Sequence, residues 1–135
     1  MSQYMNLIGQ NAKKAAFEKI NTKVKNKILT RYASLLDKER NSIIRANTKD
    51  IKFAQKKGLK NNLIDRLTIN HKKIDNIKDS INKITKLKDP IDNTLEKWSR
   101  PNGLKIKRVS IPIGVIGVIY ESRPNVTSDV ASLCF

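Results

Sequence analysis

Apolar positions recur every three to four residues over about the first 88 residues of the chain, a spacing that is typical of amphipathic helices. Small and apolar residues from Ala12 to Ile20 predict an early helix. Asn21 or Thr22 can cap a second helix, because each side chain offers an oxygen to an unpaired backbone N–H. The predicted apolar stripe of that second helix comprises Val24, Ile28, Leu29, Tyr32, Leu35 and Leu36.

The same periodicity predicts further helices up to Pro90. One helical piece is expected before Asn47 and another after it, with Gly58 as the residue that stops the second. Thr68 or Asn70 can cap a longer helix that Pro90 terminates. Its apolar seam is formed by Ile74, Ile77, Ile81, Ile84 and Leu87. Packing of this seam within its own domain is favoured over a coiled coil with a partner, because the repeat spans only about two heptads.

A β-hairpin is predicted over the next stretch. Asn102 and Gly103 lie between strand-like flanks, and both residues tolerate the positive φ that tight hairpin turns require. The alternation of apolar residues slips near Lys107 and Arg108, which predicts a bulge or bend there. Because a lone two-stranded ribbon is marginal in water, the hairpin is expected to pack on something else, such as another subunit.

A buried strand is predicted after the hairpin. Residues 115–120 (VIGVIY) are almost continuously apolar and β-branched, as in a parallel strand covered on both faces. A helix is expected to follow, with Thr127 or Ser128 as its cap. Its expected apolar face comprises Val130, Leu133 and Cys134. Strand, polar loop and helix form the first half of a βαβ unit.

The loop between this strand and helix carries the candidate chemistry. Ligands of open parallel sheets bind beyond the carboxyl ends of the strands, near helix N-termini that favour anions. Arg123 suits a phosphate or carboxylate, Asn125 is an amide donor suited to a developing oxyanion, and Glu121 can accept from a ribose hydroxyl or act on protons. A structural role is the equal alternative: Glu121 and Arg123 would tie the loop, and Asn125 would cap.

Charge and cysteine content narrow the function classes. The formal net charge of +16 suggests a polyanion partner, but the lysines are scattered and no nucleic-acid motif is present, so a solvated surface is favoured over specific nucleic-acid binding. Cys134 is the single cysteine and is expected to be a buried core residue, while His71, the single histidine, is expected at the surface, with no metal site. Neither a signal peptide nor a membrane-spanning run is recognisable, so a cytoplasmic location is predicted.

Several motifs resemble one enzyme family. The run RPNGLKIKRVSIPIGVIGVIYESRPNVTSDVASLCF, residues 100–135, is similar to γ-glutamyl phosphate reductases (glutamate-5-semialdehyde dehydrogenases), and GVIGVIYESRPNVT within it is close to diagnostic. RANTKDI, GLKNNLIDRL and LKDPI resemble the same family in the expected order. The resemblance runs from about residue 8 to residue 135.

The resemblance implies a fold and its division. The fold class would be α/β and aldehyde-dehydrogenase-like, with N-terminal helices, a β-hairpin arm and the first strand and helix of a Rossmann-type cofactor domain, cut off at the C-terminus. Residues 1–92 would form the helical part of the cofactor-binding domain and residues 93–112 the hairpin arm used for oligomerisation. Residues 113–135 would begin the Rossmann-type core.

The resemblance also implies an activity and its partners. It is the NADPH-dependent reduction of L-glutamyl 5-phosphate to L-glutamate 5-semialdehyde and phosphate, a step of proline biosynthesis. A cysteine thiolate attacks the acyl phosphate, and hydride then reduces the thioester. The implied partners are further copies of the chain, joined through the hairpin, and glutamate 5-kinase as a candidate.

Site residues follow from the same resemblance. The backbone around Tyr120, Glu121 and Ser122 is expected beside NADPH or NADP, and Arg123 is expected to hold an anionic group of the substrate. Asn125 is the expected oxyanion contact, although ungapped alignment with the wider superfamily puts Arg123 at that position.

Family members are about three times longer than this chain. The domain with the nucleophile is therefore expected to be missing, Cys134 does not lie in the catalytic motif, and the chain alone is expected to be inactive. Two other interpretations stay open: a non-catalytic module that assembles with full-length subunits, and a basic nucleic-acid-binding helical module.

Overall fold

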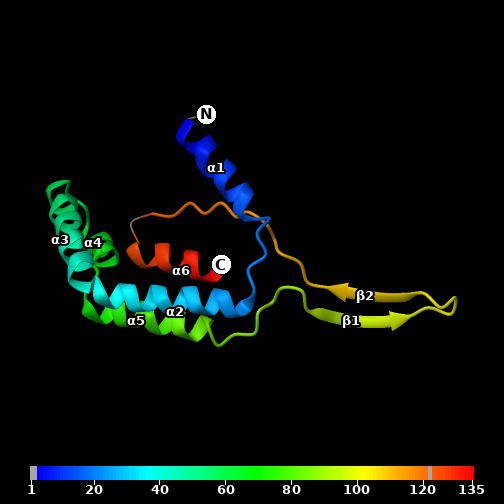
Figure 1. Cartoon of the computed structure of the whole chain (residues 1–135). Helices are drawn as coiled ribbons and strands as arrows, with labels where there is room; N and C mark the ends of the chain where they lie inside the picture. The colour runs from blue at the N-terminus through cyan, green and yellow to red at the C-terminus, as the bar shows by residue number, and fades with distance from the viewer. Residues whose placement is uncertain (1–2, 122) are drawn as a thin grey trace. The chain divides into compact units, whose positions relative to one another are not determined.

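The computed structural model describes residues 3–121 and 123–135, which divide into two compact units. The hairpin unit comprises Met1–Lys19 and Lys88–Ile116, and the helical unit comprises Ile20–Leu87 and Gly117–Phe135. The three-part division at residues 92 and 112 stays a prediction. The elements are α1 (Gln3–Ala15), α2 (Thr22–Lys38), α3 (Arg40–Lys56), α4 (Asn61–Leu67), α5 (His71–Ile84), β1 (Thr94–Ser99), β2 (Lys105–Val109) and α6 (Pro124–Cys134) (Figure 1).

Helix α5 is the centre of the helical unit. It contacts α2, α3 and α6, and Figure 1 shows it lying alongside α2. Both predicted caps are confirmed: Asn21 Oδ1 accepts from the Val24 N–H at 2.9 Å, and Asn70 Oδ1 accepts from the Lys73 N–H at 2.9 Å. These caps fix where α2 and α5 begin.

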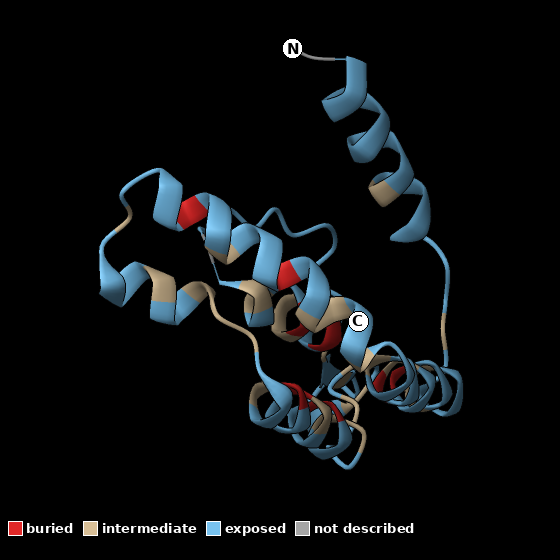
Figure 2. Ribbon diagram, turned by 90° about the vertical axis from the view of Figure 1, so that its left-hand side faces the viewer, coloured by how far each residue is buried: buried red, intermediate tan, exposed pale blue. Residues whose placement is uncertain are grey.

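The core is small and lies between these helices. Among the described residues the buried apolar side chains are Leu29, Ala33, Ala54, Ile74, Ile77 and Ile81. All of them belong to the helical unit, where Figure 2 shows the buried positions on the helices. The predicted seam of α5 is confirmed at its first three isoleucines. The helix ends at Ile84, before the predicted stop at Pro90, so Leu87 lies beyond it and is 64% exposed. The seam is therefore buried only where α2 and its neighbours cover it.

Helix α3 runs unbroken through Asn47, where the sequence pattern predicts two pieces. The expected stop at Gly58 is confirmed: its φ is +72°, and its N–H donates to the Gln55 carbonyl at 3.0 Å. The Leu59 N–H donates to the Ala54 carbonyl at 3.1 Å, which completes a Schellman motif. Glycine is favoured here because a Cβ penalises this left-handed conformation.

Asn47 holds the chain together rather than breaking it. It is buried, its Nδ2 donates to the Leu67 carbonyl at 2.9 Å, and its Oδ1 accepts from the Ile69 N–H at 2.7 Å. These two bonds tie the end of α4 to α3. Asn47 therefore lies in the middle of α3 because its side chain bonds to the end of α4 and the segment after it, although the sequence pattern predicts a break there.

Replacing Asn47 with alanine is expected to destabilise the fold by about 1–3 kcal/mol, because it leaves a buried carbonyl and a buried N–H without these partners. Urea denaturation followed by circular dichroism measures the change. Asn41→Ala, at an exposed position of the same helix, is the matched control and should change stability by no more than about 0.5 kcal/mol. Equal midpoints for the two variants would show that Asn47 has no such role.

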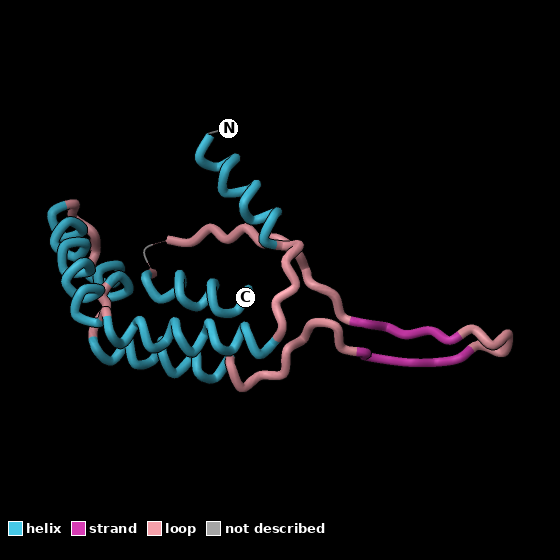
Figure 3. Tube along the Cα trace, in the orientation of Figure 1, coloured by secondary structure: helices cyan, strands magenta, loops and turns pink. Residues whose placement is uncertain are grey.

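The predicted hairpin is confirmed as a two-stranded antiparallel sheet (Figure 3). Its turn differs from a tight Asn-Gly turn, since among these two residues only Gly103 has positive φ, at +84°. The Gly103 N–H donates to the Arg100 carbonyl, and the Arg100 N–H donates to the Leu104 carbonyl, both at 2.9 Å. Pro101 pre-sets the first turn position, so a three-residue loop with a left-handed glycine is favoured over the two-residue turn.

The irregularity in the ladder lies on the opposite strand to the one expected. Thr94 pairs with Val109 and Glu96 with Arg108, so the extra residue is Leu95 in β1. The break in apolar alternation near Lys107 and Arg108 predicts the correct position along the hairpin, but the bulge is in β1 and not in β2. A sequence pattern in one strand cannot show which of two paired strands carries the extra residue.

Residues 111–121 form no strand, contrary to the prediction for residues 115–120. Ile113 and Ile119 are almost fully exposed, at 89% and 102%. A parallel strand exists only when neighbouring strands accept its hydrogen bonds and helices cover its faces. The described part of the chain supplies no such neighbouring strand. Residues 115–120 therefore have the composition of a buried strand but do not form one. The finer Rossmann-type assignment is therefore not confirmed here.

Helix α6 begins at Pro124, earlier than the predicted cap at Thr127 or Ser128. Proline is favoured at the first helical position because its fixed φ suits the helix and its missing N–H is not needed there. The buried residues of α6 are Ser128 and Ser132, so the predicted apolar face is wrong. Leu133 is 68% exposed, and Cys134 is exposed rather than buried in the core. Small polar side chains, not large apolar ones, are thus the buried positions of α6.

Candidate functional site

The candidate site lies at the N-terminal end of α6, which begins at Pro124. Arg123 is the N-cap residue of α6, and no side chain caps the helix there. Its carbonyl accepts from the Val126 N–H at 3.0 Å. The backbone N–H groups of the first turn and the helix dipole therefore favour an anion at this end. The Arg123 side chain is exposed, so its guanidinium adds positive charge at a solvent-accessible position.

Asn125 lies in the first turn of α6 and is exposed. Its Nδ2 donates to Asp129 Oδ2 at 3.0 Å, one helical turn further along. A primary amide has two N–H donors, so this bond orients the side chain while the second donor stays available for another acceptor. The arrangement fits the expected role of an amide that donates to a developing oxyanion.

The other predicted site residues lie close by in sequence but differ in their contacts. The Tyr120 hydroxyl and the Thr127 hydroxyl are 2.6 Å apart, so Thr127 ties the incoming segment to α6 instead of capping the helix. Glu121 is exposed. Ser122, expected near the cofactor, lies outside the described residues. The structure thus connects Tyr120 to α6, and the cofactor-side roles of these residues stay predictions.

A hollow that the sequence does not reveal adjoins Asn125. This α5–α6 hollow has a volume of about 260 Å³ and is lined by Lys73, Asn76, Ile77, Ser80, Asn125 and Asp129. Helix α5 lies some fifty residues before α6 in the chain, and the two pack against one another in the helical unit. Lys73, Asn76 and Ser80 sit in a lysine- and asparagine-rich helix, so no local signal distinguishes them from ordinary surface residues.

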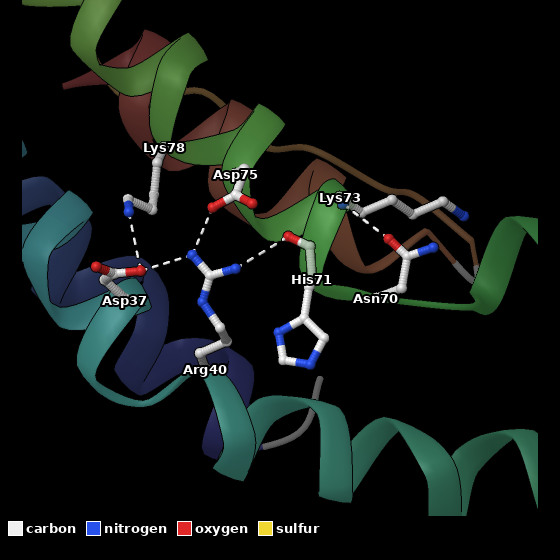
Figure 4. A network of polar contacts seen from close by, with 7 residues as sticks. All are labelled: Asp37, Arg40, Asn70, His71, Lys73, Asp75 and Lys78. Carbon is white, nitrogen blue, oxygen red and sulfur yellow. Dashed lines mark hydrogen bonds and ion pairs between the residues drawn. The ribbon is translucent and has the colours of Figure 1, made fainter.

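A charged network anchors α5 on its other side (Figure 4). Arg40 Nη2 donates to Asp37 Oδ1 at 2.6 Å and to Asp75 Oδ1 at 2.5 Å, and its Nη1 donates to the His71 carbonyl at 3.2 Å. Lys78 Nζ lies 2.9 Å from Asp37 Oδ1. One guanidinium thus joins the end of α2, the start of α3 and the start of α5. His71 itself is exposed, as expected.

This network predicts a pH dependence of stability. The hydrogen bond from Lys78, and then that from Arg40, lowers the pKa of Asp37, and the hydrogen bond from Arg40 lowers the pKa of Asp75. A carboxyl whose folded pKa is depressed stabilises the fold above its unfolded pKa, about 3.9, and that contribution is lost as the pH falls through the folded value.

Arg40→Met is therefore expected to flatten the loss of stability below about pH 5, because it removes the partner that both carboxylates share. Urea midpoints at pH 7, 5, 4 and 3 measure the slope for both proteins. Arg45→Met, in the same helix but outside the network, is the control. Parallel pH profiles for Arg40→Met and the unaltered chain would contradict the assignment.

The hairpin presents two chemically different faces. Trp98 pairs with Ile106, and Glu96 pairs with Arg108, whose Nη2 lies 3.4 Å from Glu96 Oε1. The other face carries Lys97 opposite Lys107, a like-charged pair that is unfavourable in an isolated ribbon. Both strands are largely exposed. Both faces of the hairpin are therefore exposed to solvent.

No helix in the described part of the chain combines the length and apolarity that crossing a lipid bilayer requires. No protein-family model matches the chain. Curated proteins do: a γ-glutamyl phosphate reductase of Nautilia profundicola is 48% identical over 116 residues, covering 86% of this chain and 28% of the relative. The reductase of Brucella suis is 44% identical over 136 residues, covering 99% of this chain and 32% of the relative.

Solved structures give the same result for the fold. The crystal structure of γ-glutamyl phosphate reductase from Thermotoga maritima matches with a TM-score of 0.83 and 41% identity, over 91% of this chain and 30% of that one. The Saccharomyces cerevisiae enzyme matches with a TM-score of 0.89 and 29% identity, over 98% of this chain and 34% of that one. In sequence and in fold, the chain therefore matches the N-terminal part of γ-glutamyl phosphate reductases and spans about 30% of their length.

Proposed function

We propose that the chain serves as the N-terminal part of an NADPH-dependent reductase that converts L-glutamyl 5-phosphate to L-glutamate 5-semialdehyde and phosphate in proline biosynthesis. The observation that carries the proposal is the 43–48% identity to reductases of that name over 85% or more of this chain. The fold match supports it, because such identity preserves the arrangement of helices and loops. A cytoplasmic location belongs to the same proposal.

The donor set at the start of α6 fits this chemistry. NADPH, when bound, would be the source of the hydride that reduces the acyl carbon. The chain's own part is to place its donors: the second N–H of Asn125 points a dipole at the oxygen that gains negative charge, and Arg123 pairs with an anionic group of the substrate. The backbone of Tyr120 and Glu121 is proposed to lie beside the cofactor. Stabilising an oxyanion with a preoriented amide lowers the barrier because no solvent reorganisation is needed.

The hairpin is proposed to join copies of the protein. A two-stranded ribbon exposed on both faces is marginal by itself, and Trp98 with Ile106 offers an apolar contact surface. This supports the expected homo-oligomer and also accommodates a module that assembles with full-length subunits. Glutamate 5-kinase stays a predicted partner.

A chimaeric enzyme tests the proposed function. The 116 matched residues of the N. profundicola reductase are replaced by the corresponding segment of this chain, and phosphate-dependent oxidation of glutamate 5-semialdehyde is measured with NADP⁺. The chimaera is expected to be active, because the segment supplies the same site residues in the same fold. A parallel chimaera in the Thermodesulfovibrio yellowstonii reductase, which is 47% identical over 116 residues, guards against an incompatibility with one host. Two folded but inactive chimaeras would refute the proposal.

A further inference from the structure

The α5–α6 hollow brings opposite charges together at one place. Lys73 and Asn76 come from α5, Asp129 comes from α6, and Asn125 forms part of the same lining. Lys73 Nζ donates to the Asp65 carbonyl at 2.8 Å and to the Thr68 carbonyl at 2.7 Å. An ammonium has three donors, so these bonds fix Nζ in position and leave a third N–H for a ligand. The cation is therefore held in place by α4 rather than loose in solvent.

The acceptor in the hollow is equally well placed. Asp129 is half-buried, and its Oδ2 is held by the Asn125 amide at 3.0 Å. A carboxylate has two oxygens and about four acceptor positions, so it can still accept from an ammonium group. A phosphate or a dicarboxylate would be repelled by Asp129. A zwitterion, with a carboxylate and an ammonium on one carbon, satisfies both charges.

We infer that the α5–α6 hollow binds the α-amino acid end of the substrate, with its carboxylate at Lys73 and Asn76 and its ammonium at Asp129. The inference rests on the proposed function and deepens it by naming the residues that select the substrate. Asn125 links the two regions, because one of its amide donors holds Asp129 while the other is available to the reacting carbonyl. The hollow thus recognises the end of the substrate that does not react.

Asn76→Asp in the chimaeric enzyme tests this most sharply. Asn76 is exposed and the change is nearly isosteric, so the fold should persist while the new carboxylate repels that of the substrate. The KM for glutamate 5-semialdehyde is expected to rise about 10-fold or more, the effect of losing one hydrogen bond to a charged group. The kcat should be little changed, because the contact is equally strong in the ground state and the transition state.

Matched controls separate this effect from a general loss of charge. Asn82→Asp lies on the same helix outside the hollow and should leave KM unchanged. Lys73→Met should raise KM, whereas Lys72→Met, its exposed neighbour, should not. Asp129→Asn should weaken the preference for glutamate 5-semialdehyde over 5-oxopentanoate, which lacks the amino group. Equal KM values for Asn76→Asp and Asn82→Asp would overturn the inference.

A titration of the unaltered 135-residue chain is independent of activity. With ¹⁵N labelling, the side-chain amide signals of Asn76 and Asn125 are expected to shift on addition of L-glutamate and to shift less with glutarate, which lacks the ammonium group. The Asn82 amide is the internal control. If both chimaeras are inactive, the proposed function fails, and this titration alone tests whether the α5–α6 hollow binds an α-amino acid. Absence of a shift at Asn76, or equal shifts with glutarate, would then refute it.

Discussion

Alanine at position 125 is expected to lower the kcat of a reductase carrying this segment by about 10²-fold or more, as removal of one oxyanion donor does. The loss of stability should be small, because Asn125 is exposed and its bond to Asp129 is a single surface contact within one helix. Steady-state kinetics of the chimaeric enzyme give kcat and KM, and thermal unfolding of the same preparations gives the change in stability.

Arg123→Ala is the companion variant and should behave differently. If the contact of Arg123 with an anionic group of the substrate is equally strong in the ground state and the transition state, its loss should mainly raise KM and leave kcat nearly intact. The opposite result, a large fall in kcat for Arg123→Ala and none for Asn125→Ala, would move the oxyanion contact by two residues, to the position that the wider superfamily alignment favours. Near-normal kinetics with early melting in both variants would make the loop structural.

Ile81→Ala is expected to cost about 2–5 kcal/mol of folding free energy. Ile81 is 1% exposed and packs with Leu29, Ala33 and Ile77. A core with so few buried apolar side chains has little margin, because whole domains are stable by only about 5–15 kcal/mol. Truncating this residue should therefore bring the helical unit close to unfolding at room temperature. Urea denaturation followed by circular dichroism at 222 nm measures the loss.

Leu87→Ala provides the matched comparison. Leu87 belongs to the same apolar seam in the sequence, but it is 64% exposed. Its truncation should change stability by no more than about 0.5 kcal/mol. If the two variants unfold at the same urea concentration, the core does not lie between α2 and α5 as described.

Local interactions explain what the sequence predicts correctly. The caps at Asn21 and Asn70 and the stop at Gly58 each depend on a few neighbouring residues, and all three are confirmed. The seam of α5 is predicted because one face of a helix must be covered. Long-range partners decide the rest, as Asn47 illustrates: asparagine is a weak helix former, but two bonds to residues 67–69 outweigh that preference.

The candidate site shows the same division. The sequence singles out Arg123 and Asn125 because a polar loop follows an apolar run. It does not reveal Lys73 or Asn76, which reach the site only because α5 packs against α6. The β-branched run before the loop predicts a strand, but pairing requires neighbours that the described chain does not supply. The composition of residues 115–120 therefore predicts a strand that the structure does not contain.

That exposed run has a consequence for how the protein must be handled. Residues 115–120 (VIGVIY) combine high β-propensity with no proline and no charged side chain, and such segments add to one another edge to edge when they meet. The net charge of +16 opposes such encounters, because like-charged copies repel. Salt shortens the range of that repulsion to about 8 Å at physiological ionic strength. The scattered lysines therefore act as a colloidal barrier against aggregation, one that weakens whenever the salt concentration is raised.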